Sequence, residues 1–99
     1  MKKLKFEEIS DGDWIYWIEY DKDDTDYFVS VVKKIDRKKS ELLEEWWRIK
    51  NTLKKFDNIA DYKNNDIFKN EDLKGYDIIR KMTEKEIKDF KVKLTVINL

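Results

Sequence analysis

The chain has 99 residues, of which 44 % are charged and 40 % hydrophobic, and its formal net charge is zero. This length suits one domain over residues 1–99, and four Trp, five Tyr and five Phe supply enough apolar area for a core, which excludes a disordered chain. The absence of His and Cys removes the usual general base, the thiol nucleophile and the common zinc ligands.

We therefore expect a protein that is not an enzyme and that needs no cofactor or metal. No apolar run is long enough to cross a membrane, and the first residues turn acidic before any apolar stretch of the kind found in signal peptides. Together with the lack of Cys, this predicts a cytoplasmic protein without a membrane partner.

The first predicted elements are two strands of a hairpin. The first covers residues 13–20 after the turn at Gly12, and the second covers residues 27–35, which are rich in β-branched side chains. In the first strand, apolar side chains point to both faces (Trp14, Tyr16, Ile18 and Tyr20 to one, Ile15 and Trp17 to the other). We therefore expect a sheet that is covered on one face and curved or partly covered on the other.

The predicted turn between these strands is acidic, with Asp21, Asp23, Asp24 and Asp26. A calcium loop of the EF-hand type needs Gly at its sixth position and Glu at its twelfth, and counting from Asp21 neither is present. We interpret the turn as a solvated hairpin tip. As a candidate partner-binding surface, it would suit a basic groove that normally holds nucleic acid.

Residues 41–56 carry the pattern that predicts the main helix. At roughly 100° per residue, five apolar side chains fall within about 80° of arc, namely Leu42, Trp46, Ile49, Leu53 and Phe56. Ser40 is the expected N-cap, and acidic residues follow it in the first turns of the helix. This stripe predicts that Trp46 lies in the core and that Trp47 lies outside the stripe.

The flank of the predicted helix is the first candidate for a partner-binding surface. Leu43 and Trp47 lie roughly 100° and 140° from Leu42, with Lys50 and Lys54 beside them. An apolar centre with a charged rim is typical of a recognition patch. Trp47 either anchors such a patch or fills a second core layer, and the periodicity leaves both readings open.

The rest of the chain predicts one more strand and a short helix. Residues 57–74 read as loop or short turns, and residues 76–82 as a strand. Thr83 and Glu86 have the spacing of a capping box, which predicts a helix over residues 84–90.

The final segment, residues 91–97, is ambiguous. Its apolar residues fit helical spacing, but they also alternate. Its β-branched residues favour a strand over a helix.

The segment 4–15, with Leu4, Phe6 and Ile9 ahead of Gly12-Asp13-Trp14-Ile15, resembles the entry into small SH3-like barrels. This resemblance implies a small barrel in which helix 41–56 is an insertion. The fold class that we predict is α+β. It has a small antiparallel sheet, or a partly open SH3-like barrel, packed against helix 41–56 and helix 84–90.

Lysine outnumbers arginine nineteen to three, and Ile, Asn and Asp are abundant. In this general character the chain is similar to small accessory proteins of phages and mobile elements, including anti-CRISPR and other anti-defence inhibitors. The resemblance implies an inhibitor that acts by protein–protein contact on a host protein or ribonucleoprotein complex.

A small nucleic-acid-binding module is the alternative function. Residues 33–39 hold five basic residues and one acidic residue, and exposed aromatic side chains could stack on bases. The zero net charge and the acidic neighbouring segments weigh against the strongly basic surface that such a module usually has.

Overall fold

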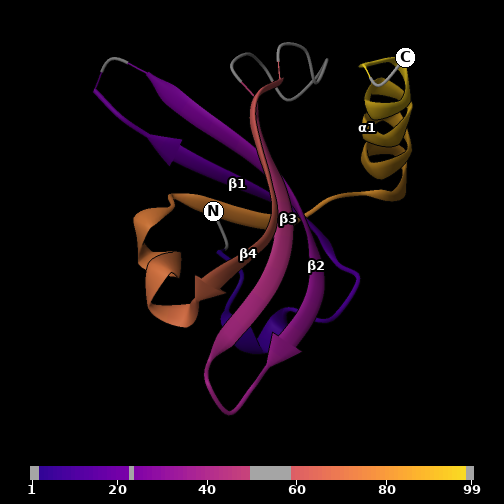
Figure 1. The fold of residues 1–99 in the computed structure, drawn as a ribbon. Helices are drawn as coiled ribbons and strands as arrows, with labels where there is room; N and C mark the ends of the chain where they lie inside the picture. The colour runs from indigo at the N-terminus through magenta and orange to yellow at the C-terminus, as the bar shows by residue number, and fades with distance from the viewer. Residues whose placement is uncertain (1–2, 23, 50–58, 98–99) are drawn as a thin grey trace.

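The computed structural model describes residues 3–22, 24–49 and 59–97, which form one antiparallel five-stranded sheet and one α-helix (Figure 1). The strands are β1 (Trp14–Tyr20), β2 (Thr25–Asp36), β3 (Glu41–Ile49), β4 (Ile59–Lys69) and β5 (Ile78–Lys81); the helices are α1 (Glu84–Ile97) and the 3-10 segments η1 (Phe6–Glu8) and η2 (Asn70–Gly75). The strand order is β4-β3-β2-β1-β5, so β4 and β5 are edges and the sheet is open rather than closed into a barrel. The predicted α+β class is confirmed.

Different parts of the chain cover the two faces of the sheet. Helix α1 lies on one side, and η1 and η2 lie on the other (Figure 1). We call the first side the α1 face, with the buried residues Tyr16, Val29, Trp47, Ile49, Met82 and Phe90. We call the second side the η face, with the buried residues Phe6, Ile9, Ile15, Trp17, Val32, Leu42, Leu73 and Ile79.

The hairpin of β1 and β2 is confirmed, with Trp14 opposite Val31 and Tyr20 opposite Thr25. Successive side chains of a strand point to opposite faces. Ile15 and Trp17 therefore belong to the core of the η face, whereas Tyr16 belongs to that of the α1 face. Both faces need apolar residues, which is why this hairpin is apolar on both sides.

The predicted helix over residues 41–56 is wrong, because residues 41–49 form β3 and residues 50–58 lie outside the described residues. The segment is built from doublets, Leu42-Leu43, Glu44-Glu45 and Trp46-Trp47. Apolar pairs that repeat every four residues imitate the i, i+4 spacing of a helix. In a sheet covered on both faces, the same doublets place one apolar residue on each side.

Ser40 does not cap a helix, because it lies in the turn that joins β2 to β3, with a left-handed φ of 53°. In this turn the Asp36 side chain accepts hydrogen bonds from the backbone N–H groups of Lys38 and Lys39, both at 3.1 Å. Short polar side chains stabilise such turns as readily as they cap helices, so the sequence signal is the same in both cases.

The loop expected within residues 57–74 is also wrong, because residues 59–69 form the edge strand β4. Its pairing with β3 shifts register twice, between Glu44 and Trp46 and between Arg48 and Ile49. Asn65, in the first of these irregularities, has φ of 55°. A polar edge strand with bulges has no regular alternation, so periodicity does not reveal it.

The capping box before α1 is confirmed. Thr83 N–H donates to Glu86 Oε1 at 2.8 Å, and Glu86 N–H donates to Thr83 Oγ1 at 3.2 Å. Glu86 also accepts two hydrogen bonds of 2.9 Å from Arg80 of β5, which ties the helix start to the sheet.

Helix α1 continues through residues 91–97, so the strand predicted there is wrong. Ile87, Phe90 and Leu94 pack on the α1 face at helical spacing, whereas Val92 is 57 % exposed. Burial of this stripe outweighs the β-propensity of the segment.

Trp47 is the centre of the α1 face. Its ring stacks on Trp14 with a centroid distance of 5.8 Å and an interplanar angle of 9°, and it meets the edge of Phe90 at 5.2 Å. Only 7 % of Trp47 is exposed, whereas Trp46 on the opposite face is half-buried.

We expect Trp47→Ala to lower the free energy of unfolding by about 3–5 kcal/mol, because it leaves a cavity in the core. Trp46→Ala should cost less, about 1–2 kcal/mol, from reduced packing and one lost hydrogen bond. Urea unfolding of both variants measures the difference. A larger loss for Trp46→Ala would contradict the strand and support the helix that the periodicity suggests.

Candidate functional site

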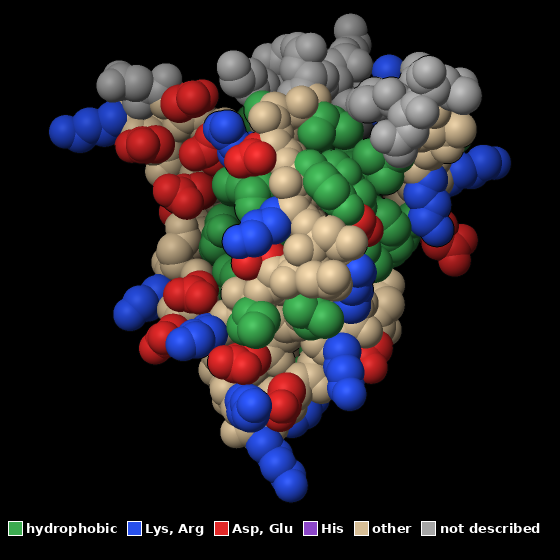
Figure 2. Space-filling view, in the orientation of Figure 1, with side chains coloured by type: hydrophobic (Ala, Val, Ile, Leu, Met, Phe, Trp, Pro, Cys, Tyr) green, Lys and Arg blue, Asp and Glu red, His purple; other side chains and the backbone are tan. Residues whose placement is uncertain are grey.

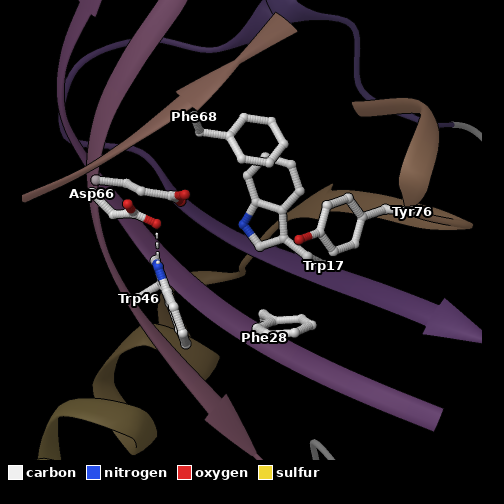
Figure 3. A pocket seen from close by; sticks show the side chains of 7 residues that line it. Trp17, Phe28, Trp46, Asp66, Phe68 and Tyr76 are labelled. Atoms are coloured by element: carbon white, nitrogen blue, oxygen red, sulfur yellow. Dashed lines mark hydrogen bonds between the residues drawn. The ribbon is translucent and has the colours of Figure 1, made fainter. Parts of the chain in front are cut away.

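A cavity of about 120 Å³ lies on the η face, between β1, β2, β3, β4 and the residue that follows η2 (Figure 3). Its lining residues are Trp17, Phe28, Glu44, Trp46, Asp66, Phe68 and Tyr76. Pockets for drug-sized ligands have volumes of about 300–1,000 Å³, so this cavity suits a single head group.

Five of the lining residues are aromatic, and their rings lie around the same space as the carboxylate of Asp66 (Figure 3). The ring centroids of Trp17 lie 4.8 Å from Phe68 and 5.3 Å from Tyr76. Those of Phe28 lie 5.8 Å from both Trp46 and Tyr76. Except for the buried Trp17, these residues are only half-buried, so the apolar layer is open at this point.

Glu44 is the buried acid of this pocket, with only 4 % of the residue exposed. Burial raises its pKa from 4.5 to about 7, opposed by a hydrogen bond from the Ser30 hydroxyl. Ser30 in turn accepts a hydrogen bond of 2.7 Å from the indole N–H of Trp17. Within residues 3–22, 24–49 and 59–97, no Lys or Arg forms an ion pair with Glu44.

Asp66 differs from Glu44 because its two oxygens are already engaged. Its Oδ2 accepts a hydrogen bond of 2.8 Å from the indole N–H of Trp46, and Lys63 Nζ lies 3.2 Å from its Oδ1. Burial alone would raise the pKa of Asp66, but the contacts with Trp46 and Lys63 outweigh it and lower the pKa. The Asp66 charge is therefore compensated inside the protein.

The pKa of Tyr76 is sensitive to the charges around the pocket. Its pKa is raised to about 12, first by burial and then by the nearby carboxylates of Glu44, Glu19, Asp72 and Asp26. A negative field of this kind disfavours any further anion and favours a cation. The pocket is therefore an apolar hollow with carboxylates close to Tyr76.

The structure separates two residues of the helix flank that the sequence predicts as a partner-binding surface. Leu43 and Trp47 lie on the same face of β3, but four residues along a strand separate them by about 13 Å. Trp47 is buried, whereas Leu43 is half-buried opposite Ile67, which is 60 % exposed. Lys50 and Lys54 lie outside the described residues.

The acidic turn lies at the end of the β1–β2 hairpin, as expected. Asp21 and Asp24 are exposed, and a backbone hydrogen bond of 2.8 Å from Asp21 N–H to Asp24 O closes the turn. Asp26 is half-buried in β2, with a carboxylate oxygen 3.7 Å from Arg48. Asp23 lies outside the described residues.

Part of the basic segment 33–39 is used within the protein. Arg37 donates hydrogen bonds to the carbonyl oxygens of Phe6 and Ile9, at 3.1 and 2.6 Å, and fixes the chain around η1. Lys33 bonds to the side chains of Asn64 and Asn65 across the sheet. These contacts weaken the case for a phosphate-binding surface at this segment.

The pocket residues were missed as a site because they come from distant parts of the chain and share no spacing. The helical pattern predicts Glu44 and Glu45 to be among the acidic residues in the first turns of a helix. The signal that could have found Glu44 is its place in a run of doublets, because a strand buried on both faces must also bury one acid of the Glu-Glu pair.

No family model, curated protein or solved structure matches this chain. In the part of the chain that the structure describes, no helix has the length and apolar character needed to cross a membrane. The candidate site therefore rests on the geometry of the pocket.

We expect the stability of the protein to fall as the pH rises from about 4.5 to 7, because Glu44 must ionise in an apolar site. Its pKa in the folded state, about 7, lies above the ordinary 4.5, so the folded state binds more protons in this window. At pH 8 the ionisation of Glu44 therefore lowers the free energy of unfolding by about 3 kcal/mol. The chain has no His, the side chain that ordinarily titrates there.

Glu44→Gln should remove this cost, so that the free energy of unfolding of the variant gains about 2.5 kcal/mol relative to the wild type between pH 5 and pH 8. Urea unfolding across this range measures it. Glu45→Gln, which removes the same charge from the other face, is the matched control and should show no such gain. If the free energies of unfolding of the wild type and of Glu44→Gln changed in parallel with pH, the burial of Glu44 without a cationic partner would be refuted.

Proposed function

We propose that this protein is a small non-enzymatic binding protein that contacts a partner protein through the aromatic pocket of the η face. The observation that carries the proposal is that Phe28, Trp46 and Phe68 remain half-buried around a cavity next to a buried carboxyl group. Large aromatic side chains at a partly open hollow are typical anchors of protein interfaces.

The lining of the pocket supports binding rather than catalysis. A carboxyl group with a pKa near 7 can serve as a proton donor or acceptor. The other lining groups, however, are aromatic rings and Asp66, whose oxygens already bind Trp46 and Lys63. Rings and a compensated carboxylate favour recognition of a ligand over activation of a nucleophile.

We extend the proposal to a cytoplasmic inhibitor from a phage or mobile element that acts on a host defence complex, in the manner of an anti-CRISPR protein. Its support is the composition of the chain and the acidic hairpin tip, which suits a basic groove of a protein or ribonucleoprotein. The nucleic-acid-binding alternative has less support, because Arg37 and Lys33 bind within the protein.

Capture by the immobilised full-length protein tests this function, with lysates of bacteria that express defence complexes. We expect a captured protein that survives nuclease treatment and salt of about 0.2 M, where affinities based on phosphate contacts have fallen steeply. Capture should be lost with Trp46→Ala and kept with Tyr20→Ala, which removes an aromatic ring that is 56 % exposed outside the pocket. Retention of nucleic acid alone, with a steep loss between about 50 and 200 mM salt, would establish the alternative instead.

A further inference from the structure

We propose that the aromatic pocket is a cage for the guanidinium group of an arginine side chain, which the partner protein inserts against Glu44. This inference rests on the proposed function and names the chemistry of the contact. It is carried by the arrangement of rings around the cavity, by the burial of Glu44 without an ion pair in the part of the chain that the structure describes, and by the carboxylates near Tyr76.

The rings provide the apolar part of a cation site. A cation within about 6 Å of an aromatic centroid is attracted by the negative face of the ring, most strongly by Trp. Trp17, Trp46 and Tyr76 lie with Phe28 and Phe68 around one cavity of about 120 Å³ (Figure 3). A cation at its centre would therefore meet several ring systems at once.

Glu44 provides the counter-ion. It is 4 % exposed, and Ser30 is its hydrogen-bond donor in the free protein. A buried carboxylate is costly unless a cation and further donors satisfy it. A ligand with a positive charge and several N–H groups would meet both requirements.

The surroundings favour a cation over an anion or a neutral group. The carboxylates of Glu44, Glu19, Asp72 and Asp26 all act on Tyr76 in the pocket. Figure 2 shows acidic side chains, with Lys and Arg side chains among them, on the side of the molecule that carries the β1–β2 hairpin, and apolar side chains next to them. The carboxylates around Tyr76 therefore favour a cation over an anion in the pocket itself.

A guanidinium group fits this site better than an ammonium group. It is planar, stacks on aromatic rings, carries five donors and is weakly hydrated, so it loses less on leaving water. A lysine ammonium is compact and strongly hydrated. Both oxygens of Asp66 are engaged, whereas Glu44 receives a hydrogen bond from Ser30 and keeps further acceptor capacity for the forked donors.

The source of the guanidinium is a protein side chain rather than free arginine. The cavity has room for one head group, so the α-amino and α-carboxyl groups of an amino acid would remain outside it. A protein partner would instead cover the half-buried rings of Phe28, Trp46 and Phe68 when its arginine enters.

An NMR titration with a blocked Gly-Arg-Gly peptide tests the cage, because each of the four Trp residues gives its own indole N–H signal. The signals of Trp17 and Trp46 should shift and saturate, with a dissociation constant on the order of millimolar for so small a ligand. Those of Trp14 and Trp47, on the α1 face, should stay in place. The blocked Gly-Lys-Gly peptide and free arginine should bind more weakly.

Glu44→Gln should lower the affinity for the arginine peptide by about tenfold or more, because it removes a charged acceptor. Glu45→Gln, its matched control, should change the affinity by less than about twofold. Trp46→Leu keeps an apolar side chain but removes a ring, and it should also weaken binding. Where a variant loses its dispersed spectrum, the wild-type titration alone decides.

Three results would overturn the proposed cage. The first is that the indole N–H signals of Trp17 and Trp46 do not shift at about 50 mM arginine peptide. The second is an equal loss of affinity in Glu44→Gln and Glu45→Gln, and the third is tighter binding of the lysine peptide or of free arginine than of the arginine peptide. If the cage fails while capture of a protein succeeds, the proposed function stands without it. If the peptide binds but no protein is captured, the cation site stands and the proposed function falls.

Discussion

Side chains alternate between the two faces of the sheet, and both faces of this sheet are covered. Neighbouring residues of β1, β2 and β3 must therefore both be suited to burial. The doublets of β3 follow from this constraint, since Trp46 joins the aromatic layer of the η face while Trp47 stacks on Trp14 under α1. The positions of η1, η2 and α1 depend on it too, because each closes a layer that the strands alone leave open.

The same constraint divides the Glu44-Glu45 pair. Glu45 points to the α1 face near the β4 edge, where its carboxylate accepts a hydrogen bond from the hydroxyl of Tyr62. Glu44 points into the aromatic layer, where burial raises its pKa, and we expect its ionisation to lower the stability of the free protein as the pH rises. Proteins tolerate such costs chiefly at functional sites, where a ligand relieves them.

Local patterns predicted the hairpin and the start of α1, because alternation and the Thr83–Glu86 capping box depend on neighbouring residues. They failed for β3 and β4, whose assignment depends on what covers each face and on bulges that hide the alternation. They also failed for residues 91–97, where packing of α1 on the sheet outweighs β-propensity.

The pocket could not be predicted from the sequence. It brings Trp17, Glu44 and Tyr76 together from separate strands and from the segment after η2, and only the strand order places them side by side. The interface role given to Trp47 rested on the helix, and the burial of Trp47 removes its basis. Asp21 and Asp24 lie at the hairpin tip, where the sequence predicts them, and the role of the acidic turn in binding stays a proposal.

The most direct measurement is the pKa of the Glu44 carboxyl, from ¹³C NMR of protein labelled in its glutamate side chains and assigned with Glu44→Gln. We expect a pKa of about 7 in the free protein, and a decrease of about one unit or more with saturating arginine peptide, because a bound cation stabilises the carboxylate. A value near 4.5 in the free protein, or one that the peptide leaves unchanged, would contradict the proposal that Glu44 is buried without a cationic partner among the described residues and receives a cation from the ligand.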